Sequence, residues 1–218
     1  MRLLNALLTA LLVLAPAAVR ATAQEPDVLL LDGKEEALFT NPLEPFLARH
    51  PGLRPESPHT ANWRGYVATF RIRDGGLWLE KVAVTRDPEQ AGGEHRSETV
   101  DVLPEFFPGK RRVLADWYTG VLLIPRGTLR EYVHMGYGST YERYLLLEVR
   151  AGRLVGRHDM TAKELDAHRR RMFEAYKRTP AYARQLAESK KAGLGAKDAE
   201  RFIFQYESAN YLTQSLQP

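Results

Sequence analysis

The residues best suited to chemistry lie together in one short stretch, residues 133–143, with the sequence VHMGYGSTYER. It combines an imidazole, two phenols, two hydroxyls, two glycines and a charged pair. His134 titrates near neutral pH, and Arg143 carries a guanidinium group that can hold an anion. Such a loop could line a pocket, with Tyr137 and Tyr141 as aromatic walls. The alternative is an ordinary connection between two strands, in which the glycines take unusual backbone angles and the tyrosines pack at the sheet edge.

The same stretch lacks the surroundings that known catalytic and metal-binding motifs need. Its Gly-x-Gly is not a phosphate loop, because no Lys-Ser/Thr pair follows it. A triad of His134, Ser139 and Asp116 has no nucleophile elbow around the serine. The six histidines form no pair at metal-ligand spacing and the chain has no cysteine, so we expect neither a metal nor another cofactor. A hydrolase in which His134 acts with Glu131 or Glu142 as acid or base remains an alternative.

A second cluster, residues 63–66 (WRGY), joins aromatic and basic side chains at the start of a predicted strand. Such residues can stack on a sugar ring or hold a carboxylate, and they can equally cap a small β core. In the second case Arg64 pairs internally with a carboxylate such as Glu142. If the strands bring both clusters to one edge, they form an aromatic and cationic site for an anionic or sugar-like ligand. The predicted ligand-binding residues are Arg64, Tyr66, His134, Tyr137, Tyr141 and Arg143.

Residues 63–79 predict the β-hairpin that organises the surrounding chain. Two runs of alternating apolar residues flank Asp74-Gly75, a pair suited to the positive φ angles of a two-residue type I′ turn. Facing side chains on one side of this hairpin should be apolar, and on the other side a cation can lie over an indole ring. The predicted cross-strand pairs are Ile72 with Leu77, Phe70 with Leu79, and Arg71 with Trp78.

The rest of the chain predicts more hairpins, followed by helices. Similar turn sequences recur at residues 124–129 and 149–154, and the consecutive leucines at 145–147 predict a strand covered on both faces. From Thr161, which forms a capping box with Glu164, the pattern becomes helical. The predicted fold class is therefore α+β, an antiparallel meander of about six to eight strands with C-terminal helices packed against it. The predicted divisions are a signal peptide (1–23), an antiparallel β domain (24–160) and a helical segment packed on the sheet (161–218).

The beginning of the chain predicts export. A basic Arg2, an apolar run over residues 3–19 and the small-x-small site at residues 21–23 are typical of a secretory signal cleaved after Ala23. The alternative is a transmembrane anchor, which Pro16 and the alanine-rich end disfavour. We therefore expect a periplasmic or secreted protein with no transmembrane anchor after cleavage. Because the chain has no cysteine, we expect no disulfides, and the form of bacterial signal in which a cysteine is acylated is excluded.

Charge sets weak limits on the partners. Loss of Arg2 and Arg20 with the signal reduces the net charge from +4 to +2, which does not demand a strongly charged partner. The helical segment is basic, and either contact with an anionic membrane surface or acidic glycan, or a solvated helix face, explains its charge. Because export separates the protein from intracellular nucleic acid, we expect no nucleic acid partner.

The WRGY hairpin and the HMGYGSxYER-type segment resemble those of a group of small bacterial proteins, over roughly residues 61–155. The resemblance implies a shared fold and a shared pocket, and it carries no reaction. We therefore interpret the protein as a non-catalytic binding or envelope-associated module with an aromatic and cationic site. The alternatives are the hydrolase based on His134 and a purely structural or interaction protein.

Overall fold

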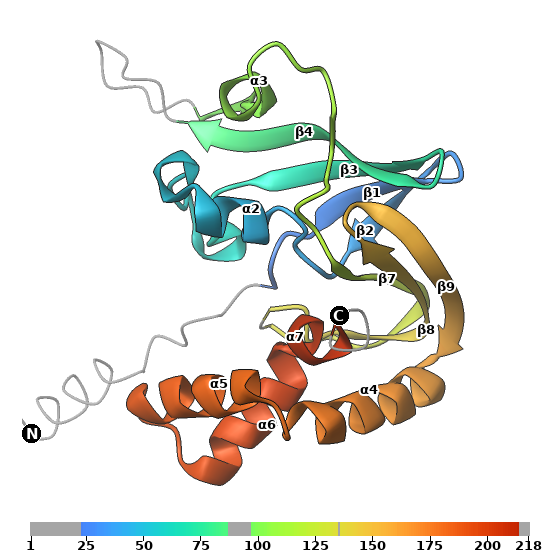
Figure 1. Cartoon of the computed structure of the whole chain (residues 1–218), viewed down its shortest axis with the longest axis vertical. Coiled ribbons are helices and arrows are strands. Elements are labelled where there is room, and N and C mark those ends of the chain that lie inside the picture. Colours follow the sequence, from blue (N-terminus) through green and yellow to red (C-terminus); the bar gives the residue numbers. More distant parts are fainter. Residues whose placement is uncertain (1–22, 87–96, 135, 214–218) are drawn as a thin grey trace, which may run out of the picture.

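A computed structural model describes residues 23–86, 97–134 and 136–213. It confirms the α+β class: one large, mostly antiparallel sheet of nine strands is followed by C-terminal helices that pack against it (Figure 1). The main path of the sheet runs β2-β1-β3-β4-β9-β8-β7, with β5 and β6 paired to β4. The strands are β1 (Asp27–Leu31), β2 (Lys34–Leu38), β3 (Val67–Arg73), β4 (Gly76–Arg86), β5 (Glu98–Asp101), β6 (Val113–Leu114), β7 (Gly120–Glu131), β8 (Thr140–Arg150) and β9 (Arg153–Thr161).

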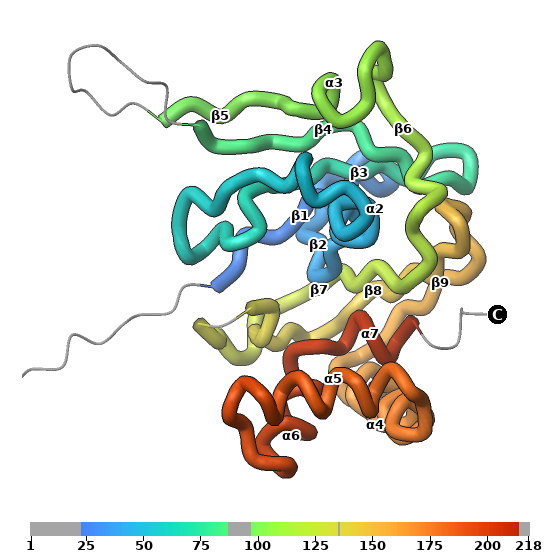
Figure 2. The backbone as a smooth tube through the Cα atoms, turned by 60° about the vertical axis from the view of Figure 1, so that its left-hand side comes forward, coloured from blue at the N-terminus to red at the C-terminus, as the bar shows by residue number. Residues whose placement is uncertain are grey.

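The helices fall into two groups (Figure 2). Short helices lie between the strands of the first half, and four helices follow the last strand. The first group is α2 (Glu44–Arg49), the 3-10 turns η1 (Pro51–Leu53) and η2 (Thr60–Asn62), and α3 (Leu103–Phe106). The second group is α4 (Ala162–Tyr176), α5 (Pro180–Lys191), α6 (Ala196–Tyr206) and α7 (Ser208–Leu212).

The central hairpin forms as predicted. Asp74 and Gly75 have φ angles of 51° and 68°, as a type I′ turn requires. All three predicted cross-strand pairs occur in the β3–β4 register. Arg71, however, pairs with Glu80 at 2.7 Å and is not the cation that lies over the indole. The guanidinium group that lies over Trp78, 5.6 Å from the ring centroid, belongs to Arg112.

Of the two recurring turns, only one is a hairpin. Residues 151 and 152 form the β8–β9 turn with φ angles of 46° and 73°. Residues 124–129 instead lie inside the continuous strand β7, whose pairing with β8 shifts register on both sides of Leu129. The glycine of that segment, Gly127, takes a positive φ of 76° within this irregularity rather than in a chain reversal. A third type I′ turn, Asp32-Gly33, joins β1 to the charged strand β2.

One strand separates two hydrophobic cores. Leu145 and Leu147 of β8 face a core that includes residues of α2 and α3, whereas Leu146 faces a second core shared with α4–α7. All three leucines are buried, so the prediction that this strand is covered on both faces is confirmed. The helical layer lies beside β7 and β8 in both views (Figures 1 and 2).

The two ends of the main strand path approach each other. The Phe39 backbone N–H, just after β2, donates to the Leu123 carbonyl of β7 at 2.8 Å. An ion pair of 2.7 Å between Arg126 and Glu36 joins the same two strands. This approach brings the segment that follows β2 next to the helical layer.

The transition from sheet to helix follows the predicted capping box. The Thr161 side chain accepts from the Glu164 N–H at 3.3 Å, and the Glu164 carboxylate accepts from the Thr161 N–H at 2.8 Å. Among the described residues, no helix combines the length and apolar composition that a bilayer crossing requires. The predicted signal peptide, apart from Ala23, lies outside the described residues.

Candidate functional site

A cleft of about 770 Å³ lies between the sheet and the helical layer. Its walls come from both layers. The sheet side supplies Gln24, the segment after β2, residues 63–64, the chain around the start of β7 and the connection that enters β8, and the helical side supplies α4, α5 and the junction of α6 with α7. Its volume falls within the range of small-molecule sites. We call it the interlayer cleft, and its main wall residues are Phe39, Thr40, Asn41, Glu44, Trp63, Arg64, Gly136, Tyr137, Arg169, Tyr176, Arg184, Gln205, Tyr206, Glu207 and Asn210.

Several charges in this lining already have partners. Arg169 donates to the Tyr211 hydroxyl at 2.8 Å and to the Phe204 carbonyl at 2.6 Å. Glu44 receives two hydrogen bonds from Arg54, at 2.8 and 3.2 Å. These groups therefore hold the walls in place, and the cleft is lined mainly by aromatic rings and neutral hydrogen-bonding groups.

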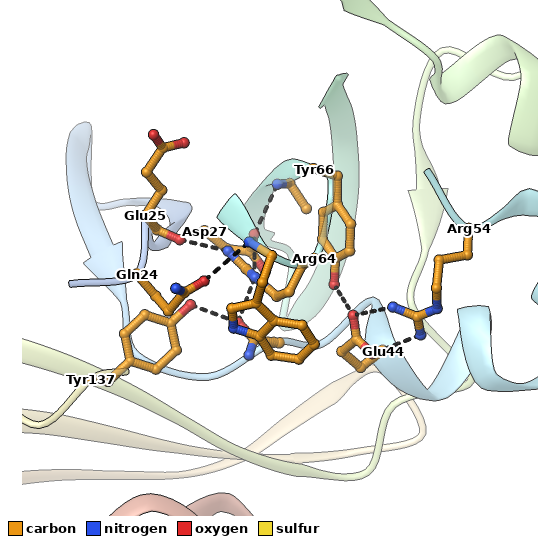
Figure 3. Close-up of polar contacts among 11 residues, drawn as sticks. Gln24, Glu25, Asp27, Glu44, Arg54, Arg64, Tyr66 and Tyr137 are labelled. Atoms are coloured by element: carbon orange, nitrogen blue, oxygen red, sulfur yellow. Dashed lines mark hydrogen bonds and ion pairs between the residues drawn. The ribbon is translucent and has the colours of Figure 1, made fainter. Parts of the chain in front are cut away.

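Arg64 is the centre of a buried polar network at one end of the cleft (Figure 3). It forms an ion pair with Asp27 at 3.0 Å, and their side chains are 1% and 0% exposed. Its guanidinium group also donates to the Asn41 side chain and the Glu25 carbonyl, both at 2.5 Å. Arg64 therefore pairs internally with a carboxylate, as one of the two predictions from the sequence had it, but the partner is Asp27 and not Glu142.

The local backbone explains why Arg64 turns inward. Gly65, the next residue, takes a positive φ of 82°, and a side chain at this position would lie 2.5 Å from the Glu56 carbonyl oxygen. Only glycine fits such an approach. Asp27 opens β1, and its carboxylate accepts from the Ala68 N–H of β3 at 2.9 Å. The ion pair thus joins the start of β1 to the segment just before β3, next to the point where the parallel pairing of the two strands begins.

The network leaves two buried atoms without a hydrogen-bond partner among the described residues, Asp27 Oδ2 and Arg64 Nε. Burial raises the pKa of Asp27 to about 6, against the lowering effect of the Arg64 charge. Burial lowers the pKa of Arg64, but the Asp27 charge and nearby phenols outweigh it, so this pKa is raised. Arg64 therefore keeps its charge at every physiological pH, and Asp27 is the member of the pair that titrates.

Two tyrosines complete the network as neutral donors. The Tyr66 hydroxyl donates to Glu44 at 2.9 Å, and the Tyr137 hydroxyl donates to Asn41 at 2.8 Å. Burial raises the pKa of both phenols, so neither acts as a base near neutral pH. The Tyr137 ring stacks on Phe39, with centroids 5.0 Å apart.

The structure gathers only some of the predicted site residues. Arg64 and Tyr137 line the cleft, and Tyr66 lies behind them with its ring 5.0 Å from the Arg64 guanidinium. Tyr141 packs edge-on against Phe39 and is not among the lining residues.

The other two predicted residues lie outside the cleft lining. His134 is exposed and packs edge-on against Tyr132, with ring centroids 4.5 Å apart. Arg143 is also exposed and pairs with Asp159 of β9 at 3.8 Å. Among the described residues, no group of three or more histidines and carboxylates could hold a metal ion.

Sequence reasoning missed Asp27, the buried acid of the network. One signal was present: Asp27 is in phase with Leu29 and Leu31 in an alternating strand, and all three are buried. A carboxylate on the apolar side of a strand must find a partner inside the protein. The identity of that partner depends on the parallel pairing of β1 with β3, which no local pattern encodes.

No protein-family model, curated protein or solved structure matches this chain.

Proposed function

We propose that the protein is a non-catalytic binding module whose interlayer cleft takes a small, sugar-like ligand. The observation that carries this proposal is Trp63, which lines the cleft while 57% exposed. An indole left open beside a polar cleft offers a flat apolar surface with a hydrogen-bonding edge. A sugar ring has the matching properties, because it presents apolar C–H faces and a rim of hydroxyl groups.

The other polar groups of the cleft suit a ligand with several hydroxyl groups better than one with a single strong charge. Gln205 and Asn210 are exposed amides that both donate and accept hydrogen bonds. Arg184 adds a cationic donor to the same cleft, and Glu207, which already accepts from the Asn210 amide at 3.1 Å, adds an acceptor. With the predicted export, this supports a periplasmic or secreted binding module.

The arrangement favours binding over hydrolysis. The catalytic alternative needs His134 and a carboxylate within hydrogen-bond reach in an open cleft. His134 lies outside the cleft lining and, among the described residues, packs against the Tyr132 ring and forms no ion pair with Glu131 or Glu142. The purely structural alternative remains, and replacement of the exposed Trp63 indole tests binding against it.

Replacement of Trp63 by alanine tests the proposal. A glycan array identifies a bound sugar, and calorimetry then compares the wild type with Trp63→Ala and with Tyr132→Ala. Tyr132 is the matched control, because it is similarly exposed, at 52%, and lies outside the cleft lining. We expect Trp63→Ala to weaken binding about tenfold or more, as for an aromatic anchor, and Tyr132→Ala to leave it unchanged.

Thermal melts should show similar midpoints for all three proteins, since both side chains are largely exposed. Equal affinity of Trp63→Ala and the wild type would exclude the indole as a binding wall. If the wild type binds no glycan on the array, the purely structural interpretation is favoured.

A further inference from the structure

The segment that follows the predicted cleavage site is fixed at the rim of the interlayer cleft. Gln24 lines the cleft, and its backbone nitrogen donates to the Gly136 carbonyl at 3.2 Å. Its side-chain amide donates to the Thr60 carbonyl at 2.7 Å and accepts from the backbone N–H of Trp63 at 3.4 Å. The next N–H, from Glu25, donates to the Ala61 carbonyl at 2.8 Å. Gln24 is therefore held by several bonds beside Trp63, the residue on which the proposed function depends.

We propose that the α-ammonium group freed by cleavage between Ala23 and Gln24 is a binding group of the cleft and selects an acidic sugar. This inference rests on the proposed function and on the predicted cleavage. In an uncleaved chain the nitrogen of Gln24 carries one hydrogen, which Gly136 already accepts. After cleavage the same nitrogen carries three hydrogens and a positive charge, because its usual pKa is about 7.7–8.0. Two donors then remain for a ligand carboxylate.

The surrounding charges leave room for this cation to act. Arg64 is neutralised by Asp27, and Glu44 by Arg54, so neither pair contributes a net charge to this end of the cleft. The Glu25 carboxylate is 3.6 Å from His59. In Figure 3 it points away from Tyr137, whereas Gln24 lies next to Tyr137. A charge-assisted hydrogen bond from the new amino terminus is therefore the strongest ionic contact available to a ligand at this rim.

One competing reaction would remove the charge. In a free N-terminal glutamine, the α-nitrogen can attack the side-chain carbonyl carbon, so that a ring C–N bond forms and ammonia leaves. The resulting lactam is uncharged. In the fold, the Gln24 amide is engaged by Thr60 and Trp63, and cyclisation would remove the donor to Thr60. We therefore expect the folded mature protein to keep an open Gln24.

The test compares three forms of the protein: one beginning at Gln24, the same form acetylated on its α-nitrogen, and one that retains Ala21-Thr22-Ala23. The two ligands are a glucuronic acid–glucose disaccharide and the corresponding neutral diglucose. We expect the Gln24 form to bind the acidic disaccharide about tenfold or more tightly than either modified form does, the usual effect of one charge-assisted hydrogen bond. The neutral disaccharide should differ little among the three forms.

The outcomes separate this inference from the proposed function. Equal affinity of all forms for the acidic disaccharide, with neutral binding that still depends on Trp63, overturns the role of the amino terminus and leaves the binding module intact. If neither disaccharide binds and no glycan on the wider array binds, both proposals are overturned. Intact mass confirms the open glutamine, and thermal melts confirm that each form is folded. The acetylated form keeps the comparison decisive if the extended form is unstable.

Discussion

Replacement of Arg64 by methionine should destabilise the protein by about 3–5 kcal/mol at neutral pH. Methionine keeps an apolar stem in the same space but removes the positive charge. Asp27, which is 0% exposed, would then retain one hydrogen bond, from the Ala68 N–H, and no counter-charge. Removal of one member of a buried ion pair is costly because it leaves the other charge uncompensated.

The pH dependence gives a second, sharper expectation. Because burial raises the pKa of Asp27 from 3.8 to about 6, the folded state binds this proton more tightly than the unfolded state does. The contribution of Asp27 to the free energy of unfolding is therefore fully present below pH 3.8 and is lost as the pH rises to about 6. A shift of this size corresponds to about 3 kcal/mol in total, of which about 2 kcal/mol falls between pH 4 and pH 7.

Urea unfolding at about pH 4 and about pH 7 tests both statements. The measured quantity is the free energy of unfolding of the wild type, Arg64→Met, Asp27→Asn and the double variant. The wild type should lose about 2 kcal/mol relative to Asp27→Asn between the two pH values, since asparagine does not titrate. The double variant should be less destabilised than the sum of the single variants, because the two residues share one interaction.

Two results would refute this reasoning. A cost below about 1 kcal/mol for Arg64→Met at neutral pH would mean that Asp27 is hydrated or otherwise compensated. A parallel pH dependence of the wild type and Asp27→Asn would mean that Asp27 does not titrate between the two pH values used.

Three further predictions concern the turns and the amino terminus. Gly75→Val should lower the free energy of unfolding by about 1–3 kcal/mol, because a β-branched residue is strained at the positive φ of the β3–β4 turn; an unchanged melting midpoint would contradict this. Ala151→Gly should raise that free energy by about 0.5–1 kcal/mol, because Ala151 occupies a left-handed conformation with φ of 46°; an unchanged or lower midpoint in urea unfolding would contradict this. N-terminal sequencing of the exported protein should begin at Gln24, and a product that retains Met1 would contradict the predicted signal.

The sequence predicts best where the signal is local. The β3–β4 hairpin is encoded by alternation and by Asp74-Gly75, so both the turn and the register follow from adjacent residues. Residues 124–129 carry a similar glycine, yet there the strand continues through an irregular region, whereas Ala151-Gly152 reverses the chain, so the glycine alone does not identify a turn. The first hairpin was missed because β2 reads KEEAL, with charges at three of its five positions.

The site was harder to predict because its contacts join distant parts of the chain. Arg64 meets Asn41 and Asp27 across 23 and 37 positions, and Tyr137 meets Asn41 across 96. These contacts form only because β1 pairs in parallel with β3 and because the end of β2 approaches β7. Residues 133–143 were predicted to form a site because of their many polar and aromatic side chains. Within this stretch, His134 and Arg143 lie outside the cleft lining, and only the residues around Tyr137 contribute to the cleft.

Adjacent residues of the WRGY segment have opposite roles in the proposed function. Arg64 is buried and its charge is neutralised by Asp27, so its loss should act mainly through stability, and a binding defect in an Arg64 variant would say little about the ligand. Trp63 is largely exposed on the same cleft, so its loss should act on the ligand with little effect on folding. The buried pair also holds the Glu25 carbonyl beside Arg64 and thereby fixes the segment that ends at Gln24. Arg64 therefore supports the rim on which Trp63 and the proposed amino terminus are presented, and variants at this rim report directly on binding only where they change Trp63 or Gln24.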